Sequence, residues 1–180
     1  MNRNATTRHI KAKVPLLFQV SLQLSSIRYK LPKSTPIYFE FVNNKTITAS
    51  ENFHKLEANG AESSIRETIE LPVLIHYESK KGYFVPNIVQ VNVFTSGSFG
   101  KKLATGSIDV TKPLNNKLTS SRETIKFEKG SDKNACLAFK LSLDFKKIYL
   151  MSEASSFEVS RFSISSIRLF NKPCRAKSDH

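Results

Sequence analysis

The sequence predicts an all-β protein, an antiparallel β-sandwich of about eight short strands. Apolar and polar residues alternate with a period of two in several segments between residues 14 and 147. No stretch within that range keeps the apolar period of about 3.6 residues that a helix requires. Of the 180 residues, 39% are hydrophobic and 10% are aromatic. That composition is enough for one core of ordinary size.

The first two predicted strands show the alternation clearly. The segment LFQVSLQLS predicts one strand, with these residues buried: Phe18, Val20, Leu22 and Leu24. A turn, LPKSTP, follows it, because two prolines interrupt any strand there. The segment IYFEFV then predicts a second strand, with these residues buried: Ile37, Phe39 and Phe41. A third, shorter strand is predicted near Thr46–Thr48, within a polar stretch.

The middle of the chain predicts two further strands, joined by the connection ESKKGYFVPN. The first is ETIELPVLIHY, with one face formed by Ile69, Leu71, Val73, Ile75 and Tyr77. Pro72 lacks an N–H donor, so this strand is expected at a sheet edge or with a bulge there. The second is IVQVNVF, with its inward face formed by Val89, Val91 and Val93.

The last three predicted strands are LATGSIDV, ETIKF and CLAFKLSLDF. The final one alternates most strictly, and its apolar face is formed by Leu137, Phe139, Leu141, Leu143 and Phe145. A single core is predicted from residues of these strands: Phe18, Leu22, Phe39, Val91, Ile108, Phe139 and Leu141.

The predicted domain organisation has three parts. Residues 1–12 form a basic extension, residues 13–148 the sandwich, and residues 149–180 a Ser-rich, mostly disordered tail that could dock on a partner. The N-terminus lacks the apolar core of a secretory signal. A transit peptide is the less favoured alternative, because VPLLFQVSLQL follows at once as a strand.

The charge indicates an acidic partner. The chain has 28 Lys and Arg against 15 Asp and Glu, a net charge of +13. Such a field favours anionic lipid, an acidic protein or nucleic acid. Pairs of lysines in predicted turns are the candidate residues for binding an acidic surface: Lys80, Lys81, Lys101 and Lys102, with Lys30 and Lys33 assisting. This requires that the pairs share a face; otherwise each is an ordinary solvated turn. Phe99, beside Lys101, is a candidate for shallow apolar insertion.

The stretch SFGKKLATGSIDVTKPL has a glycine and two lysines before a predicted strand, but it does not match the phosphate-loop motif. A phosphate loop needs GxxxxGK[ST] between a strand and a helix. Relative to Gly100 and Lys101, the first glycine is replaced by Thr95 and the final Ser or Thr by Lys102. The segment LATGSIDV that follows predicts a strand, not a helix.

No motif indicates catalysis, a metal or a cofactor. None of the histidines accompanies a GxSxG or HExxH motif: His9, His54, His76 and His180. Cys136 is predicted to be a buried apolar residue, and Cys174 lies in the polar tail. Neither belongs to a metal-binding cluster, and both fit a reducing, cytoplasmic location. We therefore expect a protein that is not an enzyme and has no small-molecule substrate.

Nucleic acid binding is an alternative for so basic a chain. Single-strand binders place aromatic residues among Lys and Arg on an exposed sheet face. Here most aromatic residues share a face with aliphatic ones, which predicts that they are core. There is no RNP-like motif and no zinc finger, so this alternative ranks below membrane or protein binding.

Several segments in a fixed order carry a resemblance to a known family. They are FQVSLQLSSI, a turn containing LP, IYFEF, ETIELPVLI, VQVNVF, a basic loop into LATGSIDVTKPL, and CLAFKLSLDF. In this order the chain resembles the N-terminal-type C2 (NT-C2) domains of EH-domain-binding proteins and early-estrogen-induced gene products, over residues 10–147. The family usually has a Trp before its fourth strand; this chain has none, and Ile65 is the nearest replacement.

The resemblance implies a C2-like sandwich and a non-catalytic adaptor that binds an anionic membrane surface, an acidic protein, or both. The remaining alternative is a scaffolding module without lipid contact. Gly106 would be a close-approach or bulge position after the basic loop. Calcium-binding C2 loops need several carboxylates, yet the loops SSIRYKLPKSTP and TSGSFGKKLATG contain only lysines as charged groups besides Arg28. We therefore expect calcium-independent, peripheral membrane association.

Overall fold

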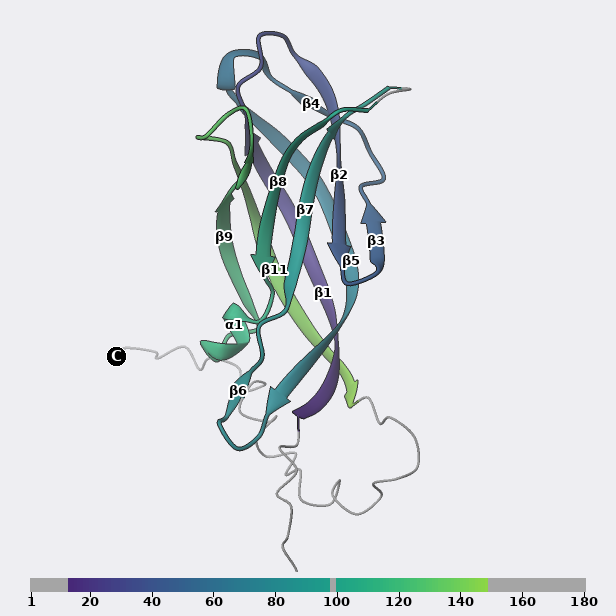
Figure 1. The fold of residues 1–180 in the computed structure, drawn as a ribbon, viewed down its shortest axis with the longest axis vertical. Coiled ribbons are helices and arrows are strands. Elements are labelled where there is room, and N and C mark those ends of the chain that lie inside the picture. The colour runs from purple at the N-terminus through teal and green to yellow at the C-terminus, as the bar shows by residue number, and fades with distance from the viewer. Residues whose placement is uncertain (1–12, 98–99, 149–180) are drawn as a thin grey trace, which may run out of the picture.

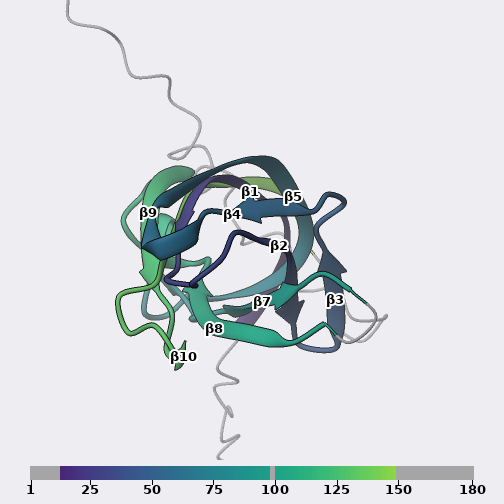
Figure 2. The same cartoon turned by 90° about the horizontal axis from the view of Figure 1, so that it is seen from above.

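Two antiparallel sheets pack face to face in the computed structural model, which describes residues 13–97 and 100–148 (Figures 1 and 2). The five-stranded sheet has the order β6-β5-β1-β11-β9. Its strands are β1 (Lys13–Arg28), β5 (Glu62–Glu78), β6 (Tyr83–Phe84), β9 (Ser120–Lys126) and β11 (Cys136–Ile148).

The six-stranded sheet has the order β10-β8-β7-β2-β3, and β4 pairs with the start of β2. Its strands are β2 (Thr35–Asn43), β3 (Thr46–Ala49), β4 (His54–Leu56), β7 (Ile88–Thr95), β8 (Lys102–Asp109) and β10 (Lys129–Gly130). Two single turns of helix complete the described residues: the 3₁₀ turn η1 (Ala58–Gly60) and the α-helical turn α1 (Lys112–Asn115).

The predicted β-sandwich is confirmed, and each of the eight predicted strands is present. They correspond to β1, β2, β3, β5, β7, β8, β9 and β11. The structure adds β4, β6 and β10, which have three, two and two residues. Segments this short are too brief to repeat the period-two pattern, so alternation could not reveal them.

The core lies between the two sheets, where the inward residues of each strand meet. In the five-stranded sheet, Val20 of β1 pairs with Leu143 of β11 and with Leu71 of β5. Such apolar cross-strand pairs fix the register, because a slip by one residue would turn each apolar side chain to the outer face. All seven predicted core residues are buried: Phe18, Leu22, Phe39, Val91, Ile108, Phe139 and Leu141.

Two predictions about single positions in strands are also confirmed. Beside Pro72, β5 pairs with β1 alone, because β6 reaches only Tyr77 and Glu78; Pro72 therefore lies at a sheet edge. Gly106 is a close-approach position: a Cβ atom there would lie 3.2 Å from the side chains of Ile125 and Phe127.

Cys136 does not lie in the core. The expectation that it is buried is wrong: it is half-buried on the outer face of the five-stranded sheet, opposite Arg28 and Lys126. The alternation that turns Leu137 inward turns its neighbour outward. The predicted basic extension (1–12) and Ser-rich tail (149–180) lie outside the described residues.

The antiparallel strands divide the connecting loops between two ends of the sandwich. The loops that follow β1, β4, β7 and β9 lie at the end that is uppermost in Figure 1. The turns that follow β5 and β8 lie at the lower end, with β6 and α1. No helix in the described ranges is both long enough and apolar enough to cross a membrane.

Candidate binding surface

The β7–β8 hairpin holds Lys101 in its loop and Lys102 at the start of β8, both at the upper end. Thr95 closes this hairpin with two bonds: its N–H donates to the Lys101 carbonyl at 2.9 Å, and its Oγ1 accepts from the Lys101 N–H at 2.9 Å. Gly100 is required by close packing, because a Cβ atom there would lie only 2.8 Å from the Thr95 carbonyl oxygen. The backbone under both lysines is therefore fixed.

The loop after β1 holds Lys30 and Lys33 at the same end. The Lys30 N–H donates to Oδ2 of Asp132 at 2.7 Å, and the carbonyl of the next residue, Leu31, accepts from the Asn59 N–H at 2.7 Å. Just before them, the buried Tyr29 donates its hydroxyl to the Leu103 carbonyl at 2.9 Å. These bonds tie the β1 loop to η1, to β8 and to the loop after β9.

Three aromatic rings form a cluster beside Lys102, with Tyr38 and Phe94 on the outer face of the six-stranded sheet and Phe53 in the segment between β3 and β4. Tyr38 stacks on Phe94, with ring centroids 5.2 Å apart, and meets Phe53 edge-on at 6.1 Å. Phe53 is 69% exposed, the most exposed large apolar residue in the described ranges. The Lys102 ammonium lies 5.3 Å from the centroid of the Phe94 ring, a cation–π distance.

We call these residues the apical surface: Lys30, Lys33, Lys101 and Lys102, with Tyr38, Phe53 and Phe94. The four lysines come from the loop after β1 and from the β7–β8 hairpin, at one end of the sandwich (Figure 1). None of the four has an ion-pair partner among the residues that the structure describes. Their charges are therefore available to an acidic partner. Phe99 lies outside the described residues.

The other candidate pair, Lys80 and Lys81, lies at the opposite end, in the turn between β5 and β6. The eight residues of β7 separate this turn from the loop that carries Lys101, a distance of about 26 Å at the rise of a β-strand. Charges act over a Debye length of about 8–10 Å. The pairs 80–81 and 101–102 therefore cannot reach one plane together.

The turn after β5 has its own local structure. The Lys81 ammonium lies 3.5 Å from Oε1 of Glu78, and the Tyr83 hydroxyl donates to Oε2 of Glu78 at 2.9 Å. The bond from Tyr83 lowers the pKa of the Glu78 carboxyl, and the nearby charge of Lys81 adds to the effect. The same bond raises the pKa of Tyr83. Lys81 is thus partly neutralised within its own turn.

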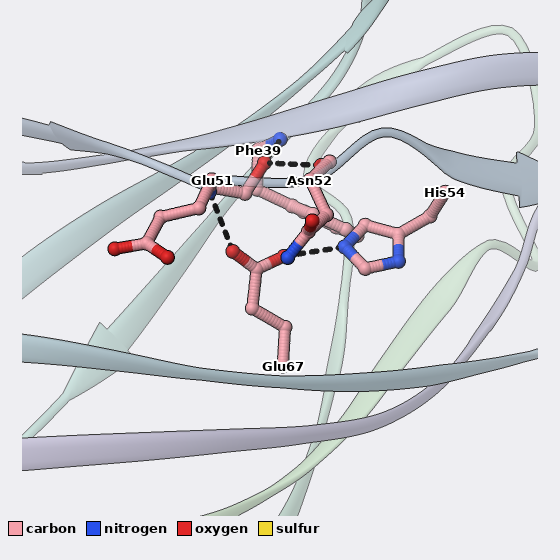
Figure 3. Close-up of polar contacts among 6 residues, drawn as sticks. Phe39, Glu51, Asn52, His54 and Glu67 are labelled. Carbon is pink, nitrogen blue, oxygen red and sulfur yellow. Dashed lines mark hydrogen bonds and ion pairs between the residues drawn. The ribbon is translucent and has the colours of Figure 1, made fainter.

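A buried carboxylate holds the segment that carries Phe53. Glu67 points inward from β5; its Oε2 lies 2.5 Å from Nε2 of His54, and its Oε1 accepts from the Glu51 N–H at 2.5 Å (Figure 3). Beside it, the Ser50 hydroxyl accepts from the Phe39 N–H at 2.9 Å. Glu67 therefore links the five-stranded sheet to the segment between β3 and β4.

Sequence reasoning missed the aromatic part of this surface and the carboxylate beneath it, although the alternation contained both signals. Since Ile37 and Phe39 point inward, Tyr38 must point outward. The same rule turns Phe94 outward after Val93. In β5 it turns Glu67 inward, and a charged residue at an inward position requires a polar partner.

Comparisons with known proteins support the fold at the level of structure alone. No protein-family model matches the chain, and no curated protein matches its sequence. In structure, the chain is similar to a pair of C2 domains of Extended-Synaptotagmin 2, with a TM-score of 0.51 and 14% identity over 76% of this chain. It spans 42% of that chain.

A second similar structure is human GIVD cytosolic phospholipase A2. The TM-score is 0.52 at 10% identity, over 76% of this chain and 17% of that one. A structure of Extended-Synaptotagmin 2 that contains its SMP domain besides the two C2 domains gives 0.52 at 12% identity, over 76% of this chain and 29% of that chain. The fold is therefore that of a C2 domain, and this chain spans less than half of each of these three chains.

The upper loops offer few ligands for a cation. In the described ranges, no group of three or more His, Cys, Asp or Glu side chains is placed to hold a metal ion. Asp132 lies beside Lys30, and both of its oxygens already accept backbone N–H groups, from Lys30 at 2.7 Å and from Asn134 at 2.9 Å. Calcium independence therefore stays a prediction, to be tested by titration.

Proposed function

We propose that this chain is a non-catalytic, cytoplasmic adaptor of the NT-C2 type that binds the anionic surface of a membrane without calcium. The apical surface is the binding element. The observation that carries the proposal is the placement, at one end of a C2 sandwich, of four lysines without ion-pair partners in the described ranges, together with the exposed Phe53. Anionic lipid attracts the lysines, and the aromatic ring suits the interface between headgroups and acyl chains.

The energetics favour reversible recruitment. A lysine near an anionic bilayer contributes about 1 kcal/mol, so four lysines at one end supply about 4 kcal/mol. That corresponds to roughly a thousandfold in partitioning. Phe53 adds apolar area to this, and Tyr38 and Phe94 flank it on the same face. Reversible binding of this kind does not require each ammonium group to hold one fixed position against the lipid, which suits mobile lysine side chains.

The geometry also sets an orientation. Lys30, Lys33, Lys101 and Lys102 face the bilayer when the upper end of Figure 1 approaches it. Lys80 and Lys81 then point away, at more than a Debye length from the lipid. The proposal therefore assigns binding to the β1 and β7 loops, with no contribution from the turn after β5.

Vesicle flotation tests the proposal. We expect the wild type to float with vesicles that contain about 30% phosphatidylserine at about 0.15 M salt, and the variant Lys30→Glu/Lys33→Glu/Lys101→Glu/Lys102→Glu to stay in the dense fraction. The matched control is Lys45→Glu/Lys80→Glu/Lys117→Glu/Lys147→Glu, which changes the net charge equally outside the apical surface. It should still float.

Two outcomes would contradict the proposal. Equal loss of flotation in both variants would mean that net charge, and no particular surface, governs binding. Failure of the wild type to float at all would favour the alternative, a scaffolding module that contacts proteins only. The melting temperature of each variant, measured in parallel, separates loss of binding from loss of fold.

A further inference from the structure

A second basic region lies away from the apical surface, on the outer face of the five-stranded sheet. In the register between β9 and β11, Arg122 lies directly opposite Lys140. Both side chains are exposed. Like charges directly opposite on neighbouring strands destabilise a sheet. Neither has an ion-pair partner among the described residues, so no ion pair in this part of the chain offsets the local repulsion.

This pair borders a groove. One shallow depression runs over β1, β11 and β9, and is lined by Gln23, Ser25, Arg122, Thr124, Ala138 and Lys140 among others. A second, of about 760 Å³, continues toward the upper end past Lys126, Cys136 and Lys30. The two depressions share Thr124. We call the two adjoining depressions the basic groove, with Arg122, Lys126 and Lys140 as its basic residues; Lys30, at its upper end, belongs to the apical surface.

Few carboxylates oppose these cations. Asp132 already accepts backbone N–H groups at 2.7 and 2.9 Å. Glu62 faces Arg28, at 3.9 Å, and also accepts the hydroxyl of Ser26. Glu123 also lines the first depression, and its carboxylate lies 3.3 Å from the ammonium of Lys112. The basic groove therefore keeps a positive charge that a ligand could neutralise.

The shape of the groove indicates an extended ligand. Sites that enclose a single phosphate use backbone N–H groups from a helix N-terminus or a nest. Here the floor is formed by strand residues such as Ala138, whose backbone lies within the paired β11 ladder. Arg122 and Lys126 are four residues apart on β9, or about 13 Å, a spacing that an extended chain with repeated acidic side chains can match.

We propose that the basic groove binds an extended acidic segment of a partner protein, with its carboxylates against Arg122, Lys140 and Lys126. The segment comes from another molecule, because both ends of this chain, residues 1–12 and 149–180, carry more Lys and Arg than Asp and Glu. The groove lies on a sheet face, whereas the apical surface lies at a strand end. The proposed contacts use none of the four apical lysines, so both surfaces can be occupied together, and the module would join a membrane to a protein.

Peptide binding tests this proposal. The probe is a fluorescein-labelled peptide of alternating Glu and Ser, about ten residues long, measured by anisotropy against the full chain; the same peptide with Gln for Glu is the uncharged control. We expect Lys140→Glu to weaken binding by about tenfold or more, because charge-assisted contacts are lost. Lys147→Glu, the same charge change on the same strand, should leave binding unchanged.

Two further readouts make the result specific. Lys140→Glu places a carboxylate opposite Arg122, so we expect its melting temperature to rise while its peptide affinity falls, which excludes misfolding as the cause. In a Cys174→Ser background, bound peptide should slow modification of Cys136 by a thiol reagent, since Cys136 lines the groove. Flotation with anionic vesicles should not change in Lys140→Glu.

Three outcomes would overturn the proposal: no binding of the acidic peptide by the wild type, equal weakening by Lys140→Glu and Lys147→Glu, or no protection of Cys136. Loss of vesicle flotation in Lys140→Glu would assign the groove to lipid instead. Binding of a single-stranded RNA oligonucleotide that exceeds peptide binding and is lost in Lys140→Glu would assign it to nucleic acid.

Discussion

Glu67 is a buried residue that holds in place the segment of the apical surface that carries Phe53. It lies on the inward face of β5 between Ile65 and Ile69, yet it is a carboxylate and only 9% exposed. A buried charge is tolerated when it is paired and hydrogen-bonded. His54 and the Glu51 N–H supply both partners at 2.5 Å. The segment they anchor presents Phe53, so this interaction supports the apical surface from beneath.

Removal of this carboxylate should be costly. We expect Glu67→Ala to lower the free energy of unfolding by about 3–5 kcal/mol, because it leaves His54 and a backbone N–H buried without their partner. Urea denaturation measures the difference. The matched control is Glu51→Ala, whose side chain is exposed and whose N–H remains; it should change stability by less than about 0.5 kcal/mol. Similar losses in both variants would contradict the assignment.

At the scale of elements, the two basic turns separate because one strand lies between them. The turn after β5 and the loop after β7 flank β7 on its two sides in the chain, and the two ends of a strand lie at opposite ends of a sandwich. The sequence contained this information once IVQVNVF was recognised as a strand. In contrast, how near the β1 and β7 loops lie to each other across the upper end depends on the order of strands in the sheets, which alternation alone does not determine.

The turn between β5 and β6 should show a pH-dependent stability. The Tyr83 hydroxyl lowers the pKa of Glu78 below its ordinary value of 4.5. A carboxyl with a lowered pKa stabilises the fold above its ordinary value, and the contribution is lost as the pH falls through the lowered one. We therefore expect the stability difference between wild type and Tyr83→Phe to be constant near neutral pH and to shrink below pH 4.5.

Alkaline conditions provide the second half of this test. The bond to Glu78 raises the pKa of Tyr83 above its ordinary value of 10.0, so its contribution is present below that value and is lost as the pH rises through the raised one. Denaturation curves across the pH range measure both the loss of stability in acid, through Glu78, and the loss in alkali, through Tyr83. Lys80→Gln, in the same turn, is the control and should follow the wild type in parallel. A difference between wild type and Tyr83→Phe that does not vary with pH would contradict the assigned bond.

For the whole molecule, the two-sheet fold could be predicted because buried side chains recur at every second residue along each long strand. Phe39, Val91 and Phe139 are buried for the same reason: each lies on the apolar side of a period-two pattern. Which lysines share an end could not be predicted from alternation: Lys30, Lys33, Lys101 and Lys102 lie at one end of the sandwich, whereas Lys80 and Lys81 lie at the other. The basic groove depends on the pairing of Arg122 with Lys140, which the register of β9 and β11 determines.

The distribution of charge over the whole molecule leads to the last prediction, which concerns calcium. The chain has a net charge of +13, and its upper loops present Lys30, Lys33, Lys101 and Lys102. Ca²⁺ needs six to eight oxygen ligands, and Asp132 already uses both oxygens on backbone N–H groups. We therefore expect millimolar Ca²⁺ to leave both the melting temperature and vesicle flotation unchanged.

A ligand that binds only the folded state raises the melting temperature, so thermal unfolding with Ca²⁺ or with EDTA measures calcium binding directly. Magnesium at the same concentration controls for ionic strength, and a rise with Ca²⁺ but not with Mg²⁺ would show that the upper loops form a calcium site after all.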